Sequence, residues 1–577
     1  MVAAGLPRLY RLRLWLVERL LRNERNTMLL AAAAIGVLGA GAAWLFAAAV
    51  EIVQVALTAH SGAPETIAGQ LVWWQRLLVP TVGGALAGFT LVLGQRLARG
   101  QSSTDYMEAI VVGDGTIPTR PTLAKSVASL LSIASGGSVG REGSVVQLSA
   151  WAASLAARPG HGAARRQLLV ACGAAAGISA VYNAPLAGAI FVGEIVLRTI
   201  AIESLGPLLV AAVTASVVSR SVLGAEPMFG QPDVSLGSAW ELPAYVGLGV
   251  VAGLVAPLVL FTLDAARRGF ARLTVPLPAR LALGGLVVGA ISIAVPAVWG
   301  NGGAEVRSLL HEVRPVGMLA LLLVAKLVAT AATTGSGAVG GVFTPTLLMG
   351  AALGGVWGGC LQRLWPTTIT DAGGYALVGM AALLAATTHA PLMAIVMAFE
   401  MTLDYQIILP LMLSCVIASS VAHGLGATPI YDLGGKRRAR ERAAGAPGRT
   451  IDSLLQREVP TIPLSAPFSQ VVQAFLGARL NHLFVVDGGG RFAGAIALHD
   501  IKPHLGAGDL DTLVLAADLV SPIPSVTPGA SVTEALDQLS RHQGNRLPVV
   551  DPAGRLIGCV HKLDLHLAFA ANTGETR

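Results

Sequence analysis

Long apolar stretches recur along this 577-residue chain, and they constrain its fold more than any other feature. A helix needs roughly 20 apolar residues to cross a bilayer, and each stretch comes close to that length. The stretches are residues 28–57, 77–93, 207–223, 245–263, 281–299, 316–334 and 407–422. Hydrophobic residues make up 54% of the chain and charged residues only 13%, which excludes an ordinary soluble protein. The sequence therefore predicts an integral, multi-pass membrane protein.

Basic residues flank the apolar region on both sides. Six arginines lie in the amphipathic N-terminal segment, residues 1–27, and one lysine with four arginines lies in residues 436–442. Positive charge next to membrane spans marks the cytoplasmic side, so both termini are expected in the cytoplasm. The formal net charge is +7, but arginines in these places set topology or contact anionic lipid. The lipid bilayer is therefore an expected partner, and nucleic acid is not.

The composition changes after residue 433. Residues 434–450 form a basic linker rich in glycine, alanine and arginine, and a soluble tail comes after it. The tail contains a repeat with an offset of 64 residues, so that Pro460 corresponds to Pro524 and the Val-Val-Asp of residues 485–487 to that of 549–551. Each unit has an amphipathic helix, a strand, a glycine turn and a second strand. Because one such unit is too small for a core of its own, the two are expected to pack together.

Three glycine-bounded segments lie among the apolar stretches: GDGTIP at residues 113–118, GREGS at 140–144 and GVFTP at 341–345. An anion inside a bilayer can be held by the unpaired N–H groups at a helix N-terminus. Glycine and proline allow a helix to start within the membrane where it lines a cavity. The segments therefore predict an intramembrane anion site.

The order and spacing of these segments resemble the CLC chloride channel and transporter family, whose signatures are GSGIP, GxEGP and GxFxP. The third signature is matched in full, the second except for its last residue, and the first only loosely. Further matches are CGAAAG at residues 172–177, NAPLAG at 183–188, FEM at 399–401 and Tyr431. The resemblance implies voltage-gated chloride transport by a homodimer.

The resemblance also implies a fold. Residues 28–433 would form an all-α polytopic membrane domain of tilted and broken helices in two inverted repeats. The tail resembles an α/β tandem pair of CBS domains, the first over residues 451–518 and the second over 519–571.

The family's functional positions can be carried over residue by residue. Glu142 aligns with the gating glutamate, whose carboxylate occupies the outer anion site when charged. An acid within a membrane is costly enough to be functional by default, although a structural pair with Arg141 is the alternative. Arg141 and Lys125 are expected to add positive potential beside the path, and a lysine reaching to the membrane surface is the alternative for Lys125.

The chloride ligands implied by the resemblance are Gly115, Ile117, Val342, Phe343 and Tyr431. The backbone N–H groups of Val342 and Phe343 would donate to the central anion, as would the Tyr431 hydroxyl. An interfacial aromatic anchor is the other interpretation of Tyr431. Gly115 takes the position where family members often have a serine, which puts the selectivity over nitrate in doubt.

A second departure concerns protons. Family exchangers place a proton-transferring glutamate directly after the glutamate that Glu194 matches, and this chain has Ile195 there. An isoleucine cannot carry a proton, which favours passive, channel-like conduction. Chloride/proton antiport through Glu194 or through water in the cavity is the alternative. Phe343 keeps the chloride-type motif and argues against a fluoride exporter.

CBS pairs of the family often bind adenine nucleotides through the last aspartate of each unit, here Asp500 and Asp564. Nucleotide-binding units usually have serine or threonine three residues earlier, where this chain has Ala497 and His561. We therefore expect a structural module, with nucleotide binding as the alternative.

Other classes of function fit the sequence less well. A CBS-bearing divalent-cation channel, the remote alternative, needs a pore lined with carboxylates, because hard cations prefer oxygen ligands. No enzyme motif is evident. The four cysteines stand far apart and indicate no metal site. We expect chloride or another small anion as the bound ion, no required cofactor, and a bacterial inner membrane as the location.

Overall fold

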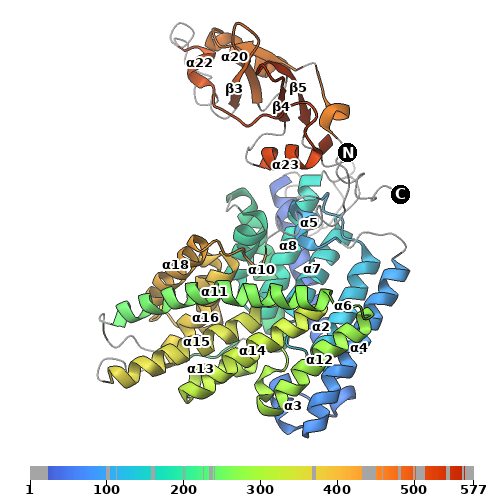
Figure 1. Ribbon diagram of the computed structural model, residues 1–577, viewed down its shortest axis with the longest axis vertical. Helices are drawn as coiled ribbons and strands as arrows, with labels where there is room; N and C mark the ends of the chain where they lie inside the picture. The colour runs from blue at the N-terminus through green and yellow to red at the C-terminus, as the bar shows by residue number, and fades with distance from the viewer. Residues whose placement is uncertain are drawn as a thin grey trace, which may run out of the picture. The chain divides into compact units, whose positions relative to one another are not determined.

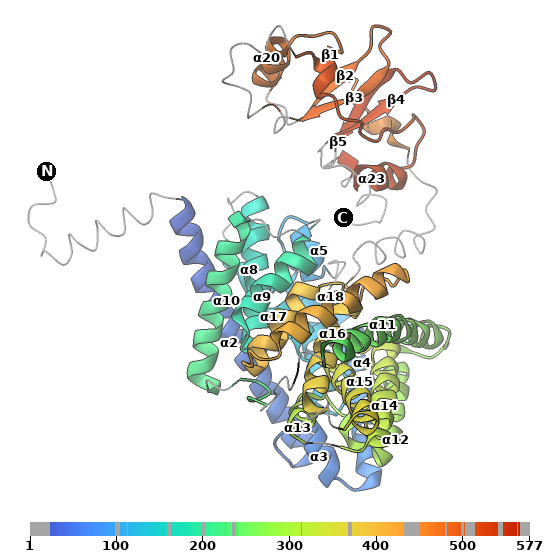
Figure 2. The ribbon, with the colours of Figure 1, turned by 90° about the vertical axis from the view of Figure 1, so that its left-hand side faces the viewer.

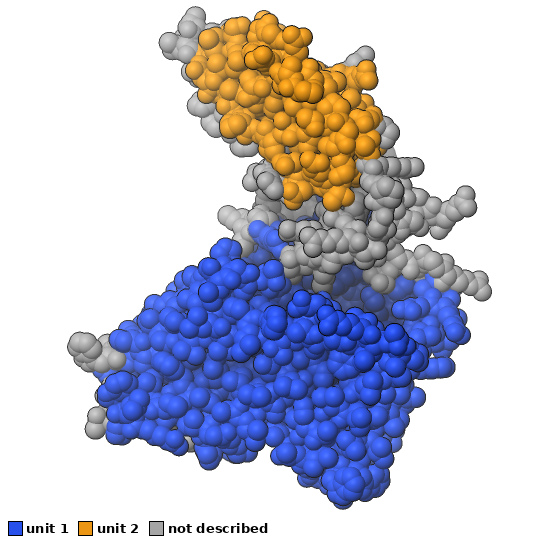
Figure 3. Space-filling model, viewed as in Figure 1, with its two compact units in different colours: residues 1–433 blue, residues 434–577 orange. Residues whose placement is uncertain are grey.

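The computed structural model describes residues 24–565 except 99–103, 112, 158–162, 199–201, 225–226, 233–237, 239–240, 313, 367–371, 432–449, 458, 479–481, 498–500, 502–513, 541–545 and 562–563. It divides into two compact units, residues 1–433 and 434–577 (Figure 3). Each unit is described by itself. Asp500 lies outside the described residues.

The described part of the first unit is helical, as predicted, with helices packed at varied tilts (Figure 1). The helices of its first half are α2 (Glu24–Thr58), α3 (Pro64–Gln70), α4 (Trp73–Leu97), α5 (Tyr106–Val111), α6 (Thr119–Ala134), α7 (Glu142–Ala156), α8 (Ala163–Tyr182), α9 (Pro185–Phe191), the π-helix η1 (Val192–Leu197) and α10 (Ile202–Leu223). Those of its second half are α11 (Leu242–Ala271), α12 (Leu277–Ala294), η3 (Pro296–Val298), α13 (Gly303–His311), α14 (Val316–Ser336), α15 (Phe343–Leu364), α16 (Ala372–Thr388), α17 (Pro391–Thr402) and α18 (Ile408–Gly424).

Within the described residues, 6 helices are long and apolar enough to span a membrane, and they coincide with the first six predicted stretches. The seventh stretch forms α18, which is apolar but shorter. Large apolar side chains point outward from the long helices: Trp44, Phe89 and Phe261 are 51%, 62% and 62% exposed. Such exposure would be costly in water and is favourable against lipid, so the first unit has the surface of a membrane protein.

The two halves of the first unit repeat one another. In the first half α8 packs on α7, α9 and α10, and in the second half α16 packs on α15, α17 and α18 in the same order. The starts of α9 and α17 also match in detail, because Asn183 and His389 both have left-handed backbone (φ 55 and 56) before an Ala-Pro-Leu sequence. The predicted pair of repeats is therefore visible in the packing of these helices.

Each repeat caps a helix of the other with a carboxylate. The first N–H groups of a helix lack intrahelical acceptors and are stabilised by an acceptor from elsewhere. Glu400, near the end of α17, accepts from the N–H groups of Leu186 (3.0 Å) and Ala187 (2.8 Å) at the start of α9. Glu194, in η1, accepts from Leu392 (3.3 Å) and Met393 (2.7 Å) at the start of α17. This exchange fastens the two halves together.

The second unit contains two small sheets (Figure 2). In the first, β1 (Thr461–Pro463) pairs in parallel with β2 (His482–Val486), which pairs antiparallel with β3 (Phe492–Ala497). In the second, β4 (Arg546–Val550) pairs antiparallel with β5 (Leu556–His561). The helical segments are η4 (Ile451–Leu454), α20 (Phe468–Ala478), α22 (Ala516–Leu519) and α23 (Val532–Ser540).

The predicted 64-residue repeat is confirmed by the turns of the two hairpins. Asp487 Oδ1 accepts from the N–H of Arg491 (2.8 Å), and Asp551 Oδ1 accepts from the N–H of Arg555 (2.7 Å). The two turns meet, because Phe492 N–H donates to Gly554 O (2.9 Å) and Leu556 N–H to Gly490 O (3.2 Å). The two repeats of the tail thus pack against each other, as expected of modules too small to have a core of their own.

Candidate functional site

The N-termini of α7 and α15 meet in the interior of the first unit. Gly140 and Gly341, just before these helices, form an antiparallel bridge: Gly140 N–H donates to Gly341 O (2.7 Å) and Gly341 N–H to Gly140 O (2.8 Å). The bridge brings together the second and third predicted segments, which are far apart in the sequence. Two helix ends, whose first N–H groups have no acceptor within their own helix, therefore face one small region, and their dipoles make it favourable for an anion.

A carboxylate occupies this region. Glu142 is the first residue of α7 and is only 2% exposed. Its Oε1 accepts from Thr344 N–H (2.8 Å) and from the Thr344 hydroxyl (3.2 Å) at the start of α15. Its Oε2 has no hydrogen-bond partner within the described residues. The side chain thus lies where an anion bound to α15 would lie.

The two bridging glycines make room for Glu142. A Cβ atom at Gly140 would lie 1.9 Å from Glu142 Oε2, and one at Gly341 would lie 2.8 Å from Glu142 Cγ. Distances this short are impossible for a side chain, so any larger residue would displace the carboxylate. Gly140 and Gly341 therefore leave space for the Glu142 side chain, and they also let the starts of α7 and α15 come close together.

Aromatic rings surround the same region. The Phe343 ring lies 5.2 Å from that of Tyr182 and 6.4 Å from that of Phe191, and Phe191 is 5.8 Å from Tyr431, measured between centroids. Tyr431 is half-buried and interacts electrostatically with Glu142. The structure thus brings the predicted ligands Phe343 and Tyr431 to the predicted gate.

Val342 immediately precedes α15, whose first internal bond runs from Thr346 N–H to Val342 O (3.0 Å). The N–H groups of Val342 and Phe343 therefore come before the intrahelical bonds, as an anion-binding helix start requires. Arg141 directly precedes α7, is half-buried, and interacts electrostatically with Glu142. Lys125 is half-buried on α6, and its effect on the path stays a prediction.

Gly115 and Ile117 are not brought to this region. The Ser154 hydroxyl, near the end of α7, donates to Gly115 O (2.7 Å) and accepts from Ile117 N–H (3.0 Å). Twelve residues of helix separate Ser154 from Glu142, which corresponds to about 18 Å. Asp114 in the same segment forms an ion pair with Arg166 of α8 (3.7 Å). The segment 113–118 thus lies at the opposite end of α7, and the placement disfavours the predicted anion contacts of Gly115 and Ile117.

The start of α5 contacts α7 nearer to Glu142 than this segment does. Tyr106, the first residue of α5, is buried. Its N–H donates to the Gln147 side chain of α7 (2.9 Å). Sequence reasoning missed this helix start because Thr104-Asp105-Tyr106 carries no glycine or proline break.

Sequence reasoning also missed Lys326 as a charged residue inside a span. It lies in the middle of α14, is fully buried, and its Nζ donates to Val298 O (3.0 Å) and Gly300 O (2.9 Å). Its charge interacts electrostatically with Glu65, Glu305 and Glu142. A single cation within the apolar stretch 316–334 is the signal that could have found it, because ionisable residues within spans are usually functional.

The comparisons with known proteins agree with this geometry. Residues 83–423 match the family model described as voltage gated chloride channel. The chain belongs to the CLC family of voltage-gated chloride channels. Residues 451–506 and 516–571 each match the model of the CBS domain. The expectation of a CLC membrane domain followed by a CBS pair is therefore confirmed.

Relatives and solved structures support the CLC assignment. A ClcB-like chloride channel protein of Ralstonia nicotianae is 50% identical over 409 residues, which cover 70% of this chain and 95% of that protein. The voltage-gated ClC-type chloride channel ClcB of Escherichia coli is 41% identical over 407 residues, covering 70% and 97%. The crystal structure of a slow cyanobacterial Cl⁻/H⁺ antiporter is similar with a TM-score of 0.64 at 26% identity, covering 73% and 99%.

Ile195, at the position where the resemblance implies a proton-transferring glutamate in exchangers, lies in η1. Ile195 is buried (5% exposed) and directly follows Glu194, whose two carboxylate oxygens both accept N–H groups of α17. A π-helix contains one more residue per turn than an α-helix and is often found at functional sites. Glu194 thus has a structural role as a helix cap, and Ile195 makes no such contact through its apolar side chain.

In the CBS pair, Asp564 is half-buried and interacts electrostatically with His561 and Cys559. Burial lowers the pKa of His561, Arg546 lowers it further, and Asp564 opposes both effects. The described residues thus place a histidine, and no hydroxyl, beside Asp564. This arrangement offers less to a nucleotide phosphate than a serine or threonine would.

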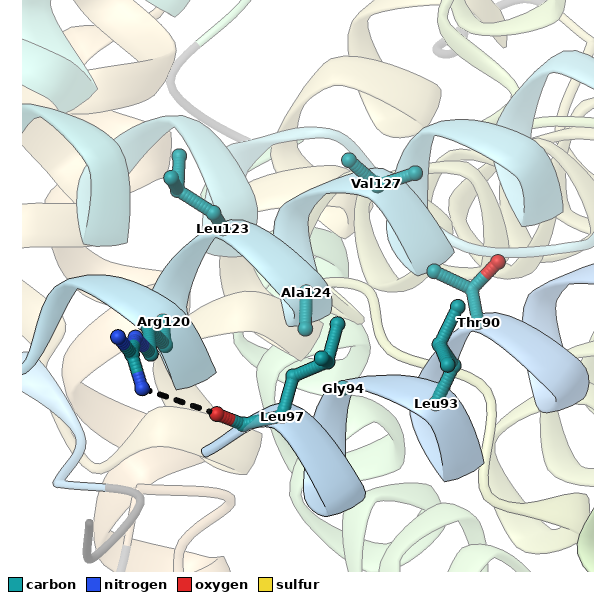
Figure 4. Close-up of a pocket in the computed structure, with 8 residues that line it drawn as sticks. All are labelled: Thr90, Leu93, Gly94, Leu97, Arg120, Leu123, Ala124 and Val127. Atoms are coloured by element: carbon teal, nitrogen blue, oxygen red, sulfur yellow. Dashed lines mark hydrogen bonds between the residues drawn. The ribbon is translucent and has the colours of Figure 1, made fainter. Parts of the chain in front are cut away.

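A groove of about 510 Å³ lies between α4 and α6 (Figure 4). At one end Arg120 Nη1 donates to Leu97 O (3.3 Å), the last residue of α4. Its walls are mostly aliphatic, and Leu93, Leu97, Leu123 and Val127 are exposed on the outer faces of the two helices. Its lining is therefore apolar apart from Thr90 and Arg120.

Proposed function

We propose that this CLC protein conducts chloride passively, as a channel, through one path in each subunit of a homodimer. The observation that carries the proposal is Ile195, which stands where exchangers of the family have a proton-transferring glutamate. We place the protein in a bacterial inner membrane with both termini in the cytoplasm, because its relatives are bacterial and its basic clusters flank the spans.

The anion path is supported by the convergence of Glu142, Val342, Phe343 and Tyr431. The two helix N-termini supply positive potential without a mobile counter-charge, and Arg141 and Lys326 add to it. Chloride would replace the Glu142 carboxylate at the start of α15 when that side chain leaves. Glu142 is therefore proposed as the gate.

The loss of proton coupling is supported by the surroundings of Ile195. An isoleucine has no group that binds a proton, and it is buried where a carboxylate would need water or a partner. Glu194 is a poor substitute, because its oxygens already accept two N–H groups at the start of α17. Moving a proton through Glu194 would cost the cap of that helix.

Chloride/proton antiport is the second candidate function. It is favoured by the similarity to the cyanobacterial antiporter, which matches nearly the whole length of that chain. Antiport here would require another inner proton route, for example water reaching Glu142 past Tyr431.

Reconstituted liposomes with a chloride gradient separate the two functions. Chloride efflux is recorded with an electrode and proton movement with a pH electrode, for the wild type and for Glu142→Ala. We expect chloride to leave without uphill proton movement, and faster efflux from Glu142→Ala. Protons driven against their gradient by chloride would establish antiport instead.

We propose that the CBS pair acts as a structural module. His561 and Ala497 in place of hydroxyl residues support this, as does the tight mutual pairing of the two hairpins. Titration of ATP, ADP and AMP into the full-length protein, followed by calorimetry, tests it. Saturable binding that is lost in Asp564→Ala would favour nucleotide regulation.

A further inference from the structure

A chain of hydroxyl groups leads to the Glu142 carboxylate. The Tyr182 hydroxyl, at the end of α8, lies 2.9 Å from the Thr344 hydroxyl, which donates to Glu142 Oε1 (3.2 Å). Tyr182 and Thr344 are both fully buried. The family signature GxFxP leaves the residue before proline unspecified, so nothing in the motif itself explains a hydroxyl at Thr344.

The direction of these hydrogen bonds depends on the number of protons. A carboxylate can only accept, and each hydroxyl has one proton to donate. If Thr344 donates its proton to Glu142, its oxygen is left to accept the proton of Tyr182. The bonds therefore run from Tyr182 to Thr344 to Glu142, and all of them favour the charged carboxylate.

We propose that Tyr182 and Thr344 form a hydroxyl latch, which holds the charged Glu142 side chain in the anion path. They are positioning residues, since they act on chloride only through Glu142. When Glu142 takes up a proton, its negative charge is lost, so its oxygen accepts the Thr344 hydrogen bond more weakly and the latch loosens. The latch rests on the proposed role of Glu142 as the gate, and it applies to a channel and to an exchanger alike.

A packing role is the rival explanation. The Tyr182 ring lies 5.2 Å from that of Phe343 and contributes to the core beside the path. Substitutions that keep shape and remove only the hydroxyl separate the two roles. Tyr182→Phe keeps the ring, Thr344→Val keeps the branched shape, and Thr344→Ser keeps the hydroxyl.

The latch predicts specific changes in chloride flux. We expect Thr344→Val to raise flux at neutral pH about tenfold, as the loss of a hydrogen bond to a charged group would, and Tyr182→Phe to raise it about threefold. The external pH of half-maximal flux should move upward in both variants. Tyr182→Phe should have no further effect in the Thr344→Val background, because the chain is already broken. Thr344→Ser should behave as the wild type.

Two variants elsewhere in the same unit serve as matched controls. Tyr375→Phe removes a buried phenol oxygen that has no hydrogen-bond partner within the described residues. Thr402→Val removes a buried hydroxyl that, among the described residues, bonds the preceding turn at Ala398 O (2.8 Å). Both should leave the dependence of flux on pH unchanged.

The experiment measures chloride efflux from liposomes over a series of external pH values, with and without Glu142→Ala in each variant. The latch is overturned if Thr344→Val and Tyr182→Phe keep the wild-type pH curve, or if they change flux equally in the Glu142→Ala background. If Glu142→Ala itself leaves flux and its pH dependence unchanged, the proposed gate fails instead. Should Thr344→Val not fold, the pH curves of Tyr182→Phe and Thr344→Ser decide the matter.

Discussion

The ends of α9 and α17 occupy equivalent places in the two repeats but differ in the residues that come after the capping glutamate. Counting from the left-handed residues Asn183 and His389, Glu194 and Glu400 stand at the same distance. The next left-handed residue is Arg198, four positions after Glu194, in one repeat and Leu403, three positions after Glu400, in the other. The first repeat thus has one additional residue, within η1.

This difference indicates that the glutamate, and not the residue after it, has the structural role. Both glutamates cap the helix of the other repeat, so the cap is needed twice and is not specific to transport. The residue after each glutamate takes no part in these caps. The residue at position 195 can therefore be changed without removing the caps that join the two halves.

The largest expected effect comes from removing the caps. Glu194→Ala and Glu400→Ala should each destabilise the first unit by about 2 kcal/mol, because each leaves two helix N–H groups without their charged acceptor. Thermal unfolding of the protein in detergent measures this. A loss of stability in only one of the two variants would break the equivalence of the repeats.

A second prediction compares the glycines at the starts of α7 and α15. Gly140→Ala should expel the Glu142 carboxylate, because the new Cβ would lie 1.9 Å from Oε2. We expect chloride flux about tenfold higher and nearly independent of pH, as for Glu142→Ala, if the closed gate is held by one charged hydrogen bond. Gly143→Ala, whose Cβ would meet atoms only at 3.4 Å or more, is the control. Unchanged flux in Gly140→Ala would mean that the carboxylate is not the group that blocks the path.

A smaller effect is expected from placing a glutamate at position 195, where exchangers of the family have one. Ile195→Glu places a carboxyl directly after the cap, and chloride flux should then drive detectable proton movement in liposomes. Met401→Glu is the matched change in the second repeat, since Met401 directly follows Glu400. It should produce no coupling. Coupling in both variants, or in neither, would show that the asymmetry of the repeats does not decide proton transport.

The smallest effect lies in the tail, where the two CBS units also differ. The pKa of His561 is lowered by burial, so the unfolded state binds a proton at a higher pH than the folded state. Stability should be complete above the unfolded pKa of about 6.5 and decrease as the pH falls below it. Ala497, the corresponding residue of the first CBS domain, cannot titrate. Hydrogen exchange of full-length protein should therefore show β5 losing protection before β3 on mild acidification, and His561→Asn should remove the difference.

The sequence predicted the membrane class, the spans and the CBS pair because these depend on composition, length and repetition along the chain. It also predicted that Glu142, Phe343 and Tyr431 belong to one site, which the structure brings together. It misplaced the segment 113–118, because a glycine–proline pattern indicates a break in a helix but not which end of α7 the break lies against. The start of α5 at Tyr106, which carries no such pattern, contacts α7 nearer to Glu142 instead, at Gln147.

By itself the sequence therefore determined the kind of fold and the residues that could carry charge in a bilayer. Only the tertiary structure decided which of them meet. The bridge between Gly140 and Gly341, the exchange of caps by Glu194 and Glu400, and the chain from Tyr182 through Thr344 to Glu142 all join residues from different halves of the unit. Hydrogen bonds act over about 3 Å, and no local pattern specifies which distant backbone will come that close.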